Sequence, residues 1–217
     1  MIKKNIYIIL PLILTISSCE TPLPLYKLIY DTGIEFRGNI RDNQIPKKTL
    51  DNIEFAFIRA SIGLGSPKSI LVLARENNGI LEWVSESSEK IYTLNGKIIK
   101  TEGLPNDIEI LTFDNFNSFP HFTETTSLVN FYNPALHYQN QRISLKKKGL
   151  SKINNHIEGF EDIPVQIYEE KISMNKIYWS VKNKYYYNVV NGYLERTVQT
   201  IHPDLPPITI EFIRKYK

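Results

Sequence analysis

The side chains that most often perform catalysis are scattered through this sequence. The histidines stand singly, without the H-E-x-x-H spacing of a zinc site, and no G-x-S-x-G nucleophile turn occurs. Ser144 and Lys147 form an S-x-x-K pair, but the SDN and KTG segments that accompany it in β-lactamases and penicillin-binding proteins are absent. We therefore expect no catalytic residue, no metal and no dissociable cofactor, so that the protein is not an enzyme. The histidines are His121, His137, His156 and His202.

One residue has a definite chemical assignment. Cys19 is the only cysteine in the 217-residue chain, and it follows Ile16, Ser17 and Ser18. An aliphatic residue, two small residues and a cysteine resemble the lipobox of bacterial lipoproteins. There the thiol forms a thioether to diacylglycerol, the chain is cut before the cysteine, and the new amino group is acylated. We expect diacylglycerol and an N-acyl chain such as palmitate on Cys19, because several acyl chains anchor a protein firmly. An ordinary signal peptide with an incidental cysteine is the alternative.

Residues 1–18 have the features of a lipoprotein signal peptide. Lys3 and Lys4 precede an apolar run at 6–14, which is shorter than the roughly 20 apolar residues that span a bilayer. Glu20, in place of Asp, favours the outer membrane of a Gram-negative bacterium. These lysines supply two of the three net positive charges, so the mature chain is nearly neutral and a nucleic-acid partner is not expected. We expect a lipidated tether with a first strand at 19–43 and a β domain at 44–217.

Aromatic side chains are the second candidate for function, since the chain has 13 Tyr, 10 Phe and 2 Trp. Aromatic rings stack on sugar rings, but they also fill or flank β-sheet cores. In a strand, Tyr185 and Tyr187 share one face and Tyr186 lies on the other, so both faces cannot easily be core. The run 146–148 of three lysines is expected to be a solvated loop, with contact to an anionic polymer or lipid headgroups as the alternative. The possible glycan or partner contacts are Trp83, Trp179, Tyr185, Tyr186 and Tyr187.

Alternating aromatic or β-branched and polar residues, bounded by Gly, Pro and Asn, predict an all-β chain. We expect a mostly antiparallel barrel-like or sandwich domain with at most a short helix near 47–53. Asn95-Gly96 and Asn191-Gly192 each predict a hairpin with a type I′ turn, because both residue types adopt positive φ at low cost. The expected strands are 54–62, 69–75, 79–85, 89–94, 97–101, 107–113, 126–132, 137–145, 164–172, 176–181, 184–190, 193–201 and 207–215.

The two Asn-Gly pairs also suggest an internal repeat. Trp83 lies twelve residues before Asn95, and Trp179 lies twelve residues before Asn191. Residues 79–101 then align with 175–197, which would make two duplicated strand–hairpin halves. Chance matching is the alternative, because few residues are identical between the two segments. A true repeat requires that both segments have the same strand order.

Two stretches resemble the YjbF/GfcB-like family, the group 4 capsule polysaccharide lipoproteins. The first, 70–111, matches an aliphatic strand ending Leu-Ala, a Trp segment, a Thr-x-x-Gly-Arg hairpin and a Thr-x-Gly-Leu ending. The sequence departs from the family pattern with Lys97 for Arg, Tyr186 for Trp, Asn188 for Asp and Thr197 for Ser. With Cys19, the resemblance extends to about residue 213 and is weakest at 114–163. The second stretch matches through Asn183, Tyr185, Gly192, Arg196, Thr197, Gln199 and Pro203.

This resemblance implies a β-barrel-like antiparallel fold and an accessory role in capsule or exopolysaccharide secretion or assembly. It implies an outer-membrane β-barrel protein of the export system as partner, and it carries no catalytic residues. Together with Cys19, it places the chain on the periplasmic face of the outer membrane. The alternative is a periplasmic glycan-binding module that stacks its aromatic side chains on polysaccharide. Partner contact is expected through an aromatic patch or an exposed sheet edge, with Lys97 and Glu195 as edge positions.

Overall fold

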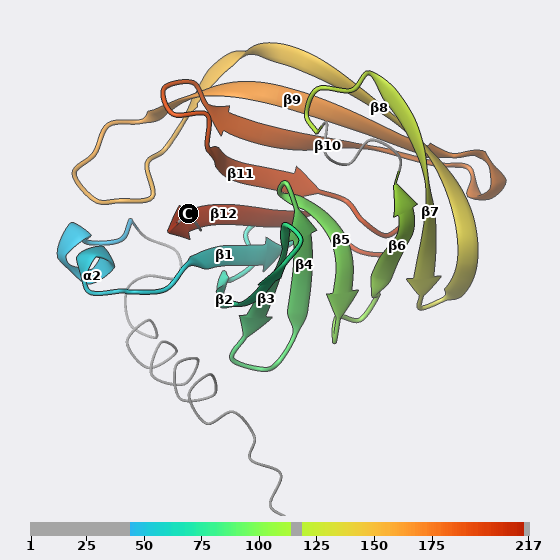
Figure 1. Ribbon diagram of the computed structural model, residues 1–217, viewed down its shortest axis with the longest axis horizontal. Helices are drawn as coiled ribbons and strands as arrows, with labels where there is room; N and C mark the ends of the chain where they lie inside the picture. Colours follow the sequence, from blue (N-terminus) through green and yellow to red (C-terminus); the bar gives the residue numbers. More distant parts are fainter. Residues whose placement is uncertain (1–43, 114–118, 215–217) are drawn as a thin grey trace, which may run out of the picture.

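The computed structural model describes residues 44–113 and 119–214, and Figure 1 shows a β-barrel with one short helix. The all-β prediction and the short helix are confirmed, and the barrel rather than the sandwich is formed. The elements are α2 (Lys47–Asp51), β1 (Phe57–Ile62), β2 (Ser69–Asn77), β3 (Ile80–Ser85), β4 (Lys90–Leu94), β5 (Lys97–Glu102), β6 (Ile108–Phe113), β7 (Glu124–Tyr132), β8 (Ala135–Ile153), β9 (Ile163–Met174), η2 (Asn175–Ile177), β10 (Trp179–Asn188), β11 (Leu194–Gln199) and β12 (Ile208–Arg214).

The sheet closes because the first and last of the described strands pair with each other. β1 and β12 run antiparallel, with Ala60 opposite Ile210, and every other strand pairs with its neighbour in sequence. Closure leaves part of one strand unpaired on one side, because β7 pairs with β8 only as far as Ser144 whereas β9 pairs with it as far as Ile153. Among the described residues, 146–153 therefore form an open strand edge, and the expected contact through a sheet edge stays a prediction. Lys97 and Glu195 are 2% and 4% exposed, which corrects their assignment as edge positions.

Both predicted hairpins form, but only the first has the predicted two-residue Asn-Gly turn. Asn95 and Gly96 both have positive φ, at 51° and 80°, and connect β4 to β5 in a type I′ turn. β10 and β11 also form a hairpin, but β10 ends before Asn191 and a longer loop follows. The Asn188 side-chain oxygen accepts hydrogen bonds from the Val190 and Asn191 backbone N–H groups, which folds this loop as an Asx turn.

The two segments of the suggested repeat have different strand order. Residues 79–101 contain β3, the turn after it, β4 and β5, whereas 175–197 contain η2, the uninterrupted β10 and β11. The alignment would match the turn between β3 and β4 with the middle of β10. The structure therefore gives no support to two duplicated halves, because the shared strand order that they require is missing.

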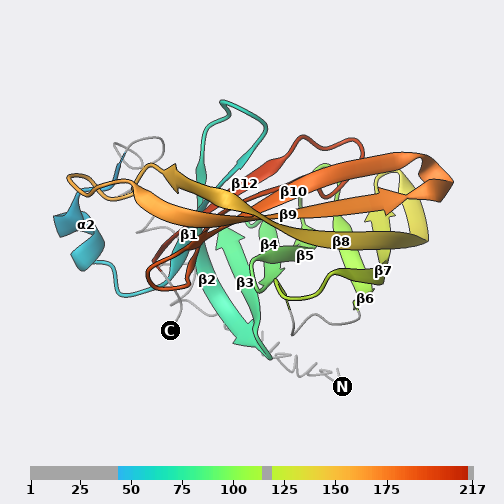
Figure 2. The ribbon, with the colours of Figure 1, turned by 90° about the horizontal axis from the view of Figure 1, so that it is seen from above.

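The strands differ in length, and this difference shapes the molecule. β8, β9 and β10 have 19, 12 and 10 residues, whereas β4, β5 and β6 have 5 or 6. The three long strands extend beyond the short ones in Figures 1 and 2. β8 includes the three lysines at 146–148, which corrects the loop expected there, and β10 joins two strands predicted separately. One face of the long strands therefore continues past the closed part of the barrel.

The main core fills the inside of the barrel with aliphatic and aromatic side chains. Trp83 lies at its centre, edge-to-face with Phe212 at 6.2 Å between ring centroids. A smaller apolar cluster lies outside the barrel, where Ile45 and Phe57 are fully buried beside Leu50 of α2. An isolated parallel bridge between Ile45 and Ile157 ties the segment before α2 to the β8–β9 loop. The chain therefore enters the barrel beside this loop, at the same end as α2 in both ribbon views.

Candidate functional site

Cys19, the expected lipid-attachment residue, lies outside the described residues. Trp83 is buried and donates a 2.8 Å hydrogen bond from Nε1 to Thr93 Oγ1, so it is chiefly a core residue. Trp179 is half-buried against Phe131, with an edge-to-face ring contact. Neither indole is an exposed stacking platform. The core interpretation of both tryptophans therefore fits their placement.

The tyrosine triplet divides between the interior and the outside of the barrel. Tyr185 is fully buried, and its hydroxyl lies 3.0 Å from Glu170 Oε2. Burial, and then the negative charge of Glu170, raises the pKa of Tyr185 well above its ordinary value. Tyr187 lies on the same face and is half-buried, with its pKa raised by burial and then by Tyr168. Tyr186 lies on the opposite face, as the alternation predicted.

A fully buried ion pair organises the interior around Tyr185. Lys97 Nζ lies 2.5 Å from Glu170 Oε1, although β5 and β9 are not neighbouring strands. Glu170 Oε2 also accepts a 2.9 Å hydrogen bond from Asn183, which leaves the carboxylate with several donors. Gln199 extends the network, because its Nε2 donates to the Gly96 carbonyl at 2.8 Å. The motif residues Asn183, Tyr185 and Gln199 thus serve one buried polar network.

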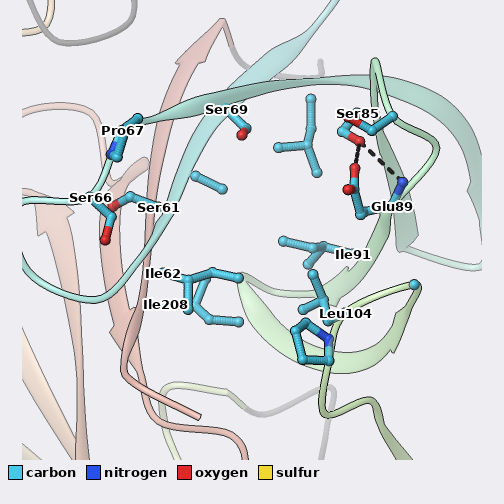
Figure 3. A pocket seen from close by; sticks show the side chains of 15 residues that line it. Ser61, Ile62, Ser66, Pro67, Ser69, Ser85, Glu89, Ile91, Leu104 and Ile208 are labelled. Carbon is cyan, nitrogen blue, oxygen red and sulfur yellow. Dashed lines mark hydrogen bonds between the residues drawn. The ribbon is translucent and has the colours of Figure 1, made fainter.

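A first cavity, of about 310 Å³, opens at the barrel end where β1, β3 and β5 finish. Figure 3 shows Ser61 and Ser66 on one side of it and Ser85 and Glu89 on the other. Ser85 Oγ donates a short hydrogen bond to Glu89 Oε2 and accepts one from the Glu89 backbone N–H at 3.1 Å. Apolar side chains complete the lining, including Leu71, Ile91, Leu104 and Ile208.

This first cavity, which we call the serine cavity, places Ser85 beside the carboxylate of Glu89. A serine nucleophile needs a neighbouring general base, and here the Glu89 carboxylate lies within hydrogen-bond reach of Ser85. No histidine is among the described residues that line this cavity. Ser144 and Lys147, the S-x-x-K pair, both lie in β8. Residues three apart in a strand point to opposite faces, so their side chains do not meet. The cavity offers hydroxyl groups and an apolar surface, which suit the binding of a small amphipathic ligand.

The opposite side of the barrel carries two adjoining cavities, which we call the tyrosine groove. One, of about 360 Å³, is lined by Trp83, Tyr187 and Tyr193 among others, and the second, of about 720 Å³, by Tyr168, Tyr187 and Lys147 among others. Tyr187 lies in both linings, so the cavities meet at this residue. Of the five predicted aromatic contacts, Trp83 and Tyr187 line this groove, but Trp83 is only 1% exposed there. Trp179, Tyr185 and Tyr186 line neither cavity.

Sequence reasoning missed Tyr168 and Tyr193 as members of the groove. Tyr168 packs edge-to-face against Tyr187, with ring centroids 5.5 Å apart, and Tyr193 is 51% exposed. Strand alternation places Tyr168 and Glu170 on one face of β9, but only the pairing of β9 with β10 identifies the neighbour. The signal for Tyr193 was its place directly after Asn191-Gly192, where a hairpin loop exposes its residues.

Outside the barrel, one carboxylate collects several basic groups. Glu211 of β12 lies 2.8 Å from Arg59, 3.1 Å from Lys68 and 3.0 Å from Arg196, and 3.8 Å from His156 Nδ1. Burial by itself would raise the pKa of Glu211. Arg59, and then the other three basic groups, outweigh that effect and lower the pKa.

Glu211 should therefore make the fold sensitive to acid. A carboxylate with a lowered folded-state pKa stabilises the fold above its unfolded-state pKa, and this contribution is lost as pH falls through the folded-state pKa. Glu211→Gln should lower the free energy of unfolding at pH 7 by roughly 2–3 kcal/mol, as for hydrogen bonds to charged groups. Urea unfolding between pH 3 and pH 7 should show a flatter acid dependence. The exposed Glu124→Gln is the control, and a parallel pH profile for Glu211→Gln would contradict the assignment.

The described residues contain neither a metal-site cluster nor a helix of membrane-spanning length. In the ranges 44–113 and 119–214, no cluster of three or more His, Cys, Asp or Glu side chains has the arrangement of a metal site. The one α-helix described there is far from the length and apolarity that crossing a bilayer demands. The linings of the three described cavities each contain at most one carboxylate, so none presents the carboxylate pair of a glycoside hydrolase.

Comparison with known proteins agrees with the resemblance found in the sequence. A sequence model of the family described as group 4 capsule polysaccharide lipoprotein GfcB, YjbF matches residues 33–213. The chain is also similar to the crystal structure of the hypothetical lipoprotein YmcC from Escherichia coli K12. The TM-score is 0.68 and the sequence identity is 14%, covering 87% of this chain and 95% of that chain. At this identity the likeness shows the shared fold. No curated protein matches the chain.

Proposed function

Because the chain belongs to the group 4 capsule polysaccharide lipoprotein family, we propose that it is a non-enzymatic outer-membrane lipoprotein that assists polysaccharide secretion. In this proposal, acylated Cys19 holds the β-barrel at the inner leaflet of the outer membrane, facing the periplasm. The observation that carries the proposal is the family match over residues 33–213, which covers the described barrel except for the last residue of β12.

The anchor explains how such a protein would act without catalysis. Confinement to a membrane surface raises the effective concentration of the barrel near a membrane partner, without any additional contact. The proposed partner is an outer-membrane β-barrel protein of the export system. The contact is assigned to loops and cavities at the barrel ends and to the part of β8 at 146–153, which pairs with β9 alone among the described strands.

The geometry supports a binding protein better than an enzyme. The described cavities have volumes of about 310, 360 and 720 Å³, which lie in the range of small-ligand sites. Their linings combine hydroxyl, amide and aromatic groups, which suit reversible contact with a polyhydroxylated molecule. These features support both the accessory role and the alternative of a glycan-binding module.

Separation of the inner and outer membranes on a density gradient tests the proposed location. The chain should sediment with the outer membrane. A protease added to intact cells should leave it uncut, and the same protease should degrade it after the outer membrane is permeabilised. Sedimentation with the inner membrane, or cleavage in intact cells, would contradict the periplasmic face of the outer membrane.

A further inference from the structure

We propose that the tyrosine groove binds an extended segment of an acidic polysaccharide. This inference rests on the proposed function, and it assigns a position and a charge preference to the polysaccharide contact. Its first basis is strand register. Lys147 of β8 lies opposite Tyr168 of β9, and Gln166 of β9 lies opposite Tyr187 of β10. Paired residues of neighbouring strands point to the same face, so these side chains form one continuous surface.

The strand lengths explain why solvent reaches this surface. Tyr185, on the same face of β10, is fully buried inside the barrel. Two residues further along, Tyr187 is half-buried, and Leu150 of β8, opposite Gln166, is 74% exposed. The surface is thus the interior face of β8, β9 and β10 at the end where it emerges from the core. A face that is buried at one end and open to solvent at the other gives a ligand apolar side chains to pack against. It also lets the ligand reach them from solvent.

The chemistry of the surface suits a sugar polymer. Sugar rings have an apolar face that stacks on aromatic rings, and a rim of hydroxyl groups that needs hydrogen-bond partners. Tyr168 and Tyr187 supply two rings at a centroid distance of 5.5 Å, and Tyr193 supplies a third that is 51% exposed. Gln166 lines the larger cavity with Tyr168 and Tyr187. Its Nε2 donates to the Lys148 carbonyl, so its side-chain oxygen is the group that can accept a hydrogen bond from a sugar hydroxyl.

The size of the groove indicates a polymer segment. Its two cavities, of about 360 and 720 Å³, each fall in the range of one ligand site, and their linings share Pro120, Tyr187 and Gly192. Tyr187 therefore contributes to both halves of one elongated site. A chain molecule can occupy both halves at once, which a single sugar cannot.

The charge of the groove favours an acidic polymer. Lys147 and His121 line the larger cavity, and no carboxylate side chain does. Within the described part of the chain, Lys147 has no ion-pair partner, whereas the neighbouring Lys148 lies 3.4 Å from Glu169 Oε1. The single acid of the groove, Glu76, lines the other cavity. The lysine side of the groove is thus free to pair with carboxylates on a ligand.

The test uses the mature chain with Cys19→Ala and two forms of one probe. The probe is polysaccharide extracted from the capsule of cells that carry the chain, in its native form and after chemical reduction of its carboxyl groups. Calorimetric titration should show binding of the native polymer, weakened by added salt and by carboxyl reduction. The double variant Lys147→Gln, Tyr168→Ala should weaken binding by about tenfold or more, as expected for the loss of one stacked ring and one charge.

The matched control lies at the other end of the long strands. Lys176→Gln, Tyr178→Ala removes the same two side-chain types near the β9–β10 turn, where Tyr178 is 99% exposed, and should leave binding unchanged. If this control variant lost as much binding affinity as the groove variant, the assigned position would be overturned. If the carboxyl-reduced polymer bound as tightly as the native polymer, the acidic preference would be overturned. No binding of either polymer would overturn the proposal. In that case, a defect in secretion on deleting the gene would still stand as support for the proposed function.

Discussion

Replacing Lys97 with methionine should lower the free energy of unfolding by about 3–5 kcal/mol, the usual cost of breaking a buried ion pair. The reason is that Glu170 would remain in the interior, 0% exposed, without the ammonium group now 2.5 Å away. Asn183 and Tyr185 would still donate to Glu170 Oε2, but neither carries a compensating charge. Urea unfolding of the mature chain with Cys19→Ala, followed by tryptophan fluorescence, measures the change.

Two companion variants make this prediction specific. Lys97→Arg should retain most of the stability, because it keeps the positive charge and the resemblance places arginine at this position. Lys100→Met, also in β5, removes a lysine whose side chain is 36% exposed and which pairs with Glu102 at 3.0 Å. Its cost should be about 1 kcal/mol or less, as for exposed ion pairs. Equal losses for Lys97→Met and Lys100→Met would contradict the role assigned to the buried pair.

Cys19→Ala should move nearly all of the protein from the membrane fraction to the periplasmic fraction. The thiol is the only cysteine sulfur in the chain, so no other residue can form the thioether to diacylglycerol. Several acyl chains hold a protein on a bilayer, and their loss removes the whole anchor at once. Labelling with radioactive palmitate and immunoblotting of the two fractions give the readout.

Ser18→Ala is the matched control for the anchor. It changes the residue next to the cysteine but keeps a small side chain at that place in the lipobox. This variant should incorporate palmitate and stay in the membrane fraction like the original chain. Retention of Cys19→Ala on membranes after a high-salt wash would contradict acylation as the sole attachment.

Local patterns were enough to predict the fold class but not its closure. Alternation along strands such as β4, and the positive φ values of Asn95 and Gly96, follow from properties of a few adjacent residues. The closure depends on the pairing of β1 with β12, whose residues are far apart in the sequence. At the second Asn-Gly pair, the side chain of Asn188 folds the loop and displaces the expected turn. Tertiary and side-chain contacts of this kind produce no periodic pattern in the amino-acid sequence from which they could be predicted.

Only part of the candidate site could be predicted, because the rest of it also depends on contacts between distant strands. The alternation of Tyr185 and Tyr187 was visible in the sequence, but which of them is buried depends on where β10 leaves the core. Lys97 was expected at a strand edge. A lysine is rarely buried unless its charge is paired, and the partner, Glu170, comes from a strand across the barrel. Lys147 joins the groove through register with Tyr168, which is set by the pairing of β8 with β9.

The central claim is that the anchored chain assists secretion of polysaccharide, and its most direct test is the location of that polymer. The measurement is the ratio of cell-surface to envelope-retained polysaccharide in cells that lack the gene. These cells are compared after complementation with the original chain or with Cys19→Ala. The account predicts that the ratio falls on deletion, that the original chain restores it, and that Cys19→Ala restores it poorly. An unchanged ratio in cells without the gene would contradict the account.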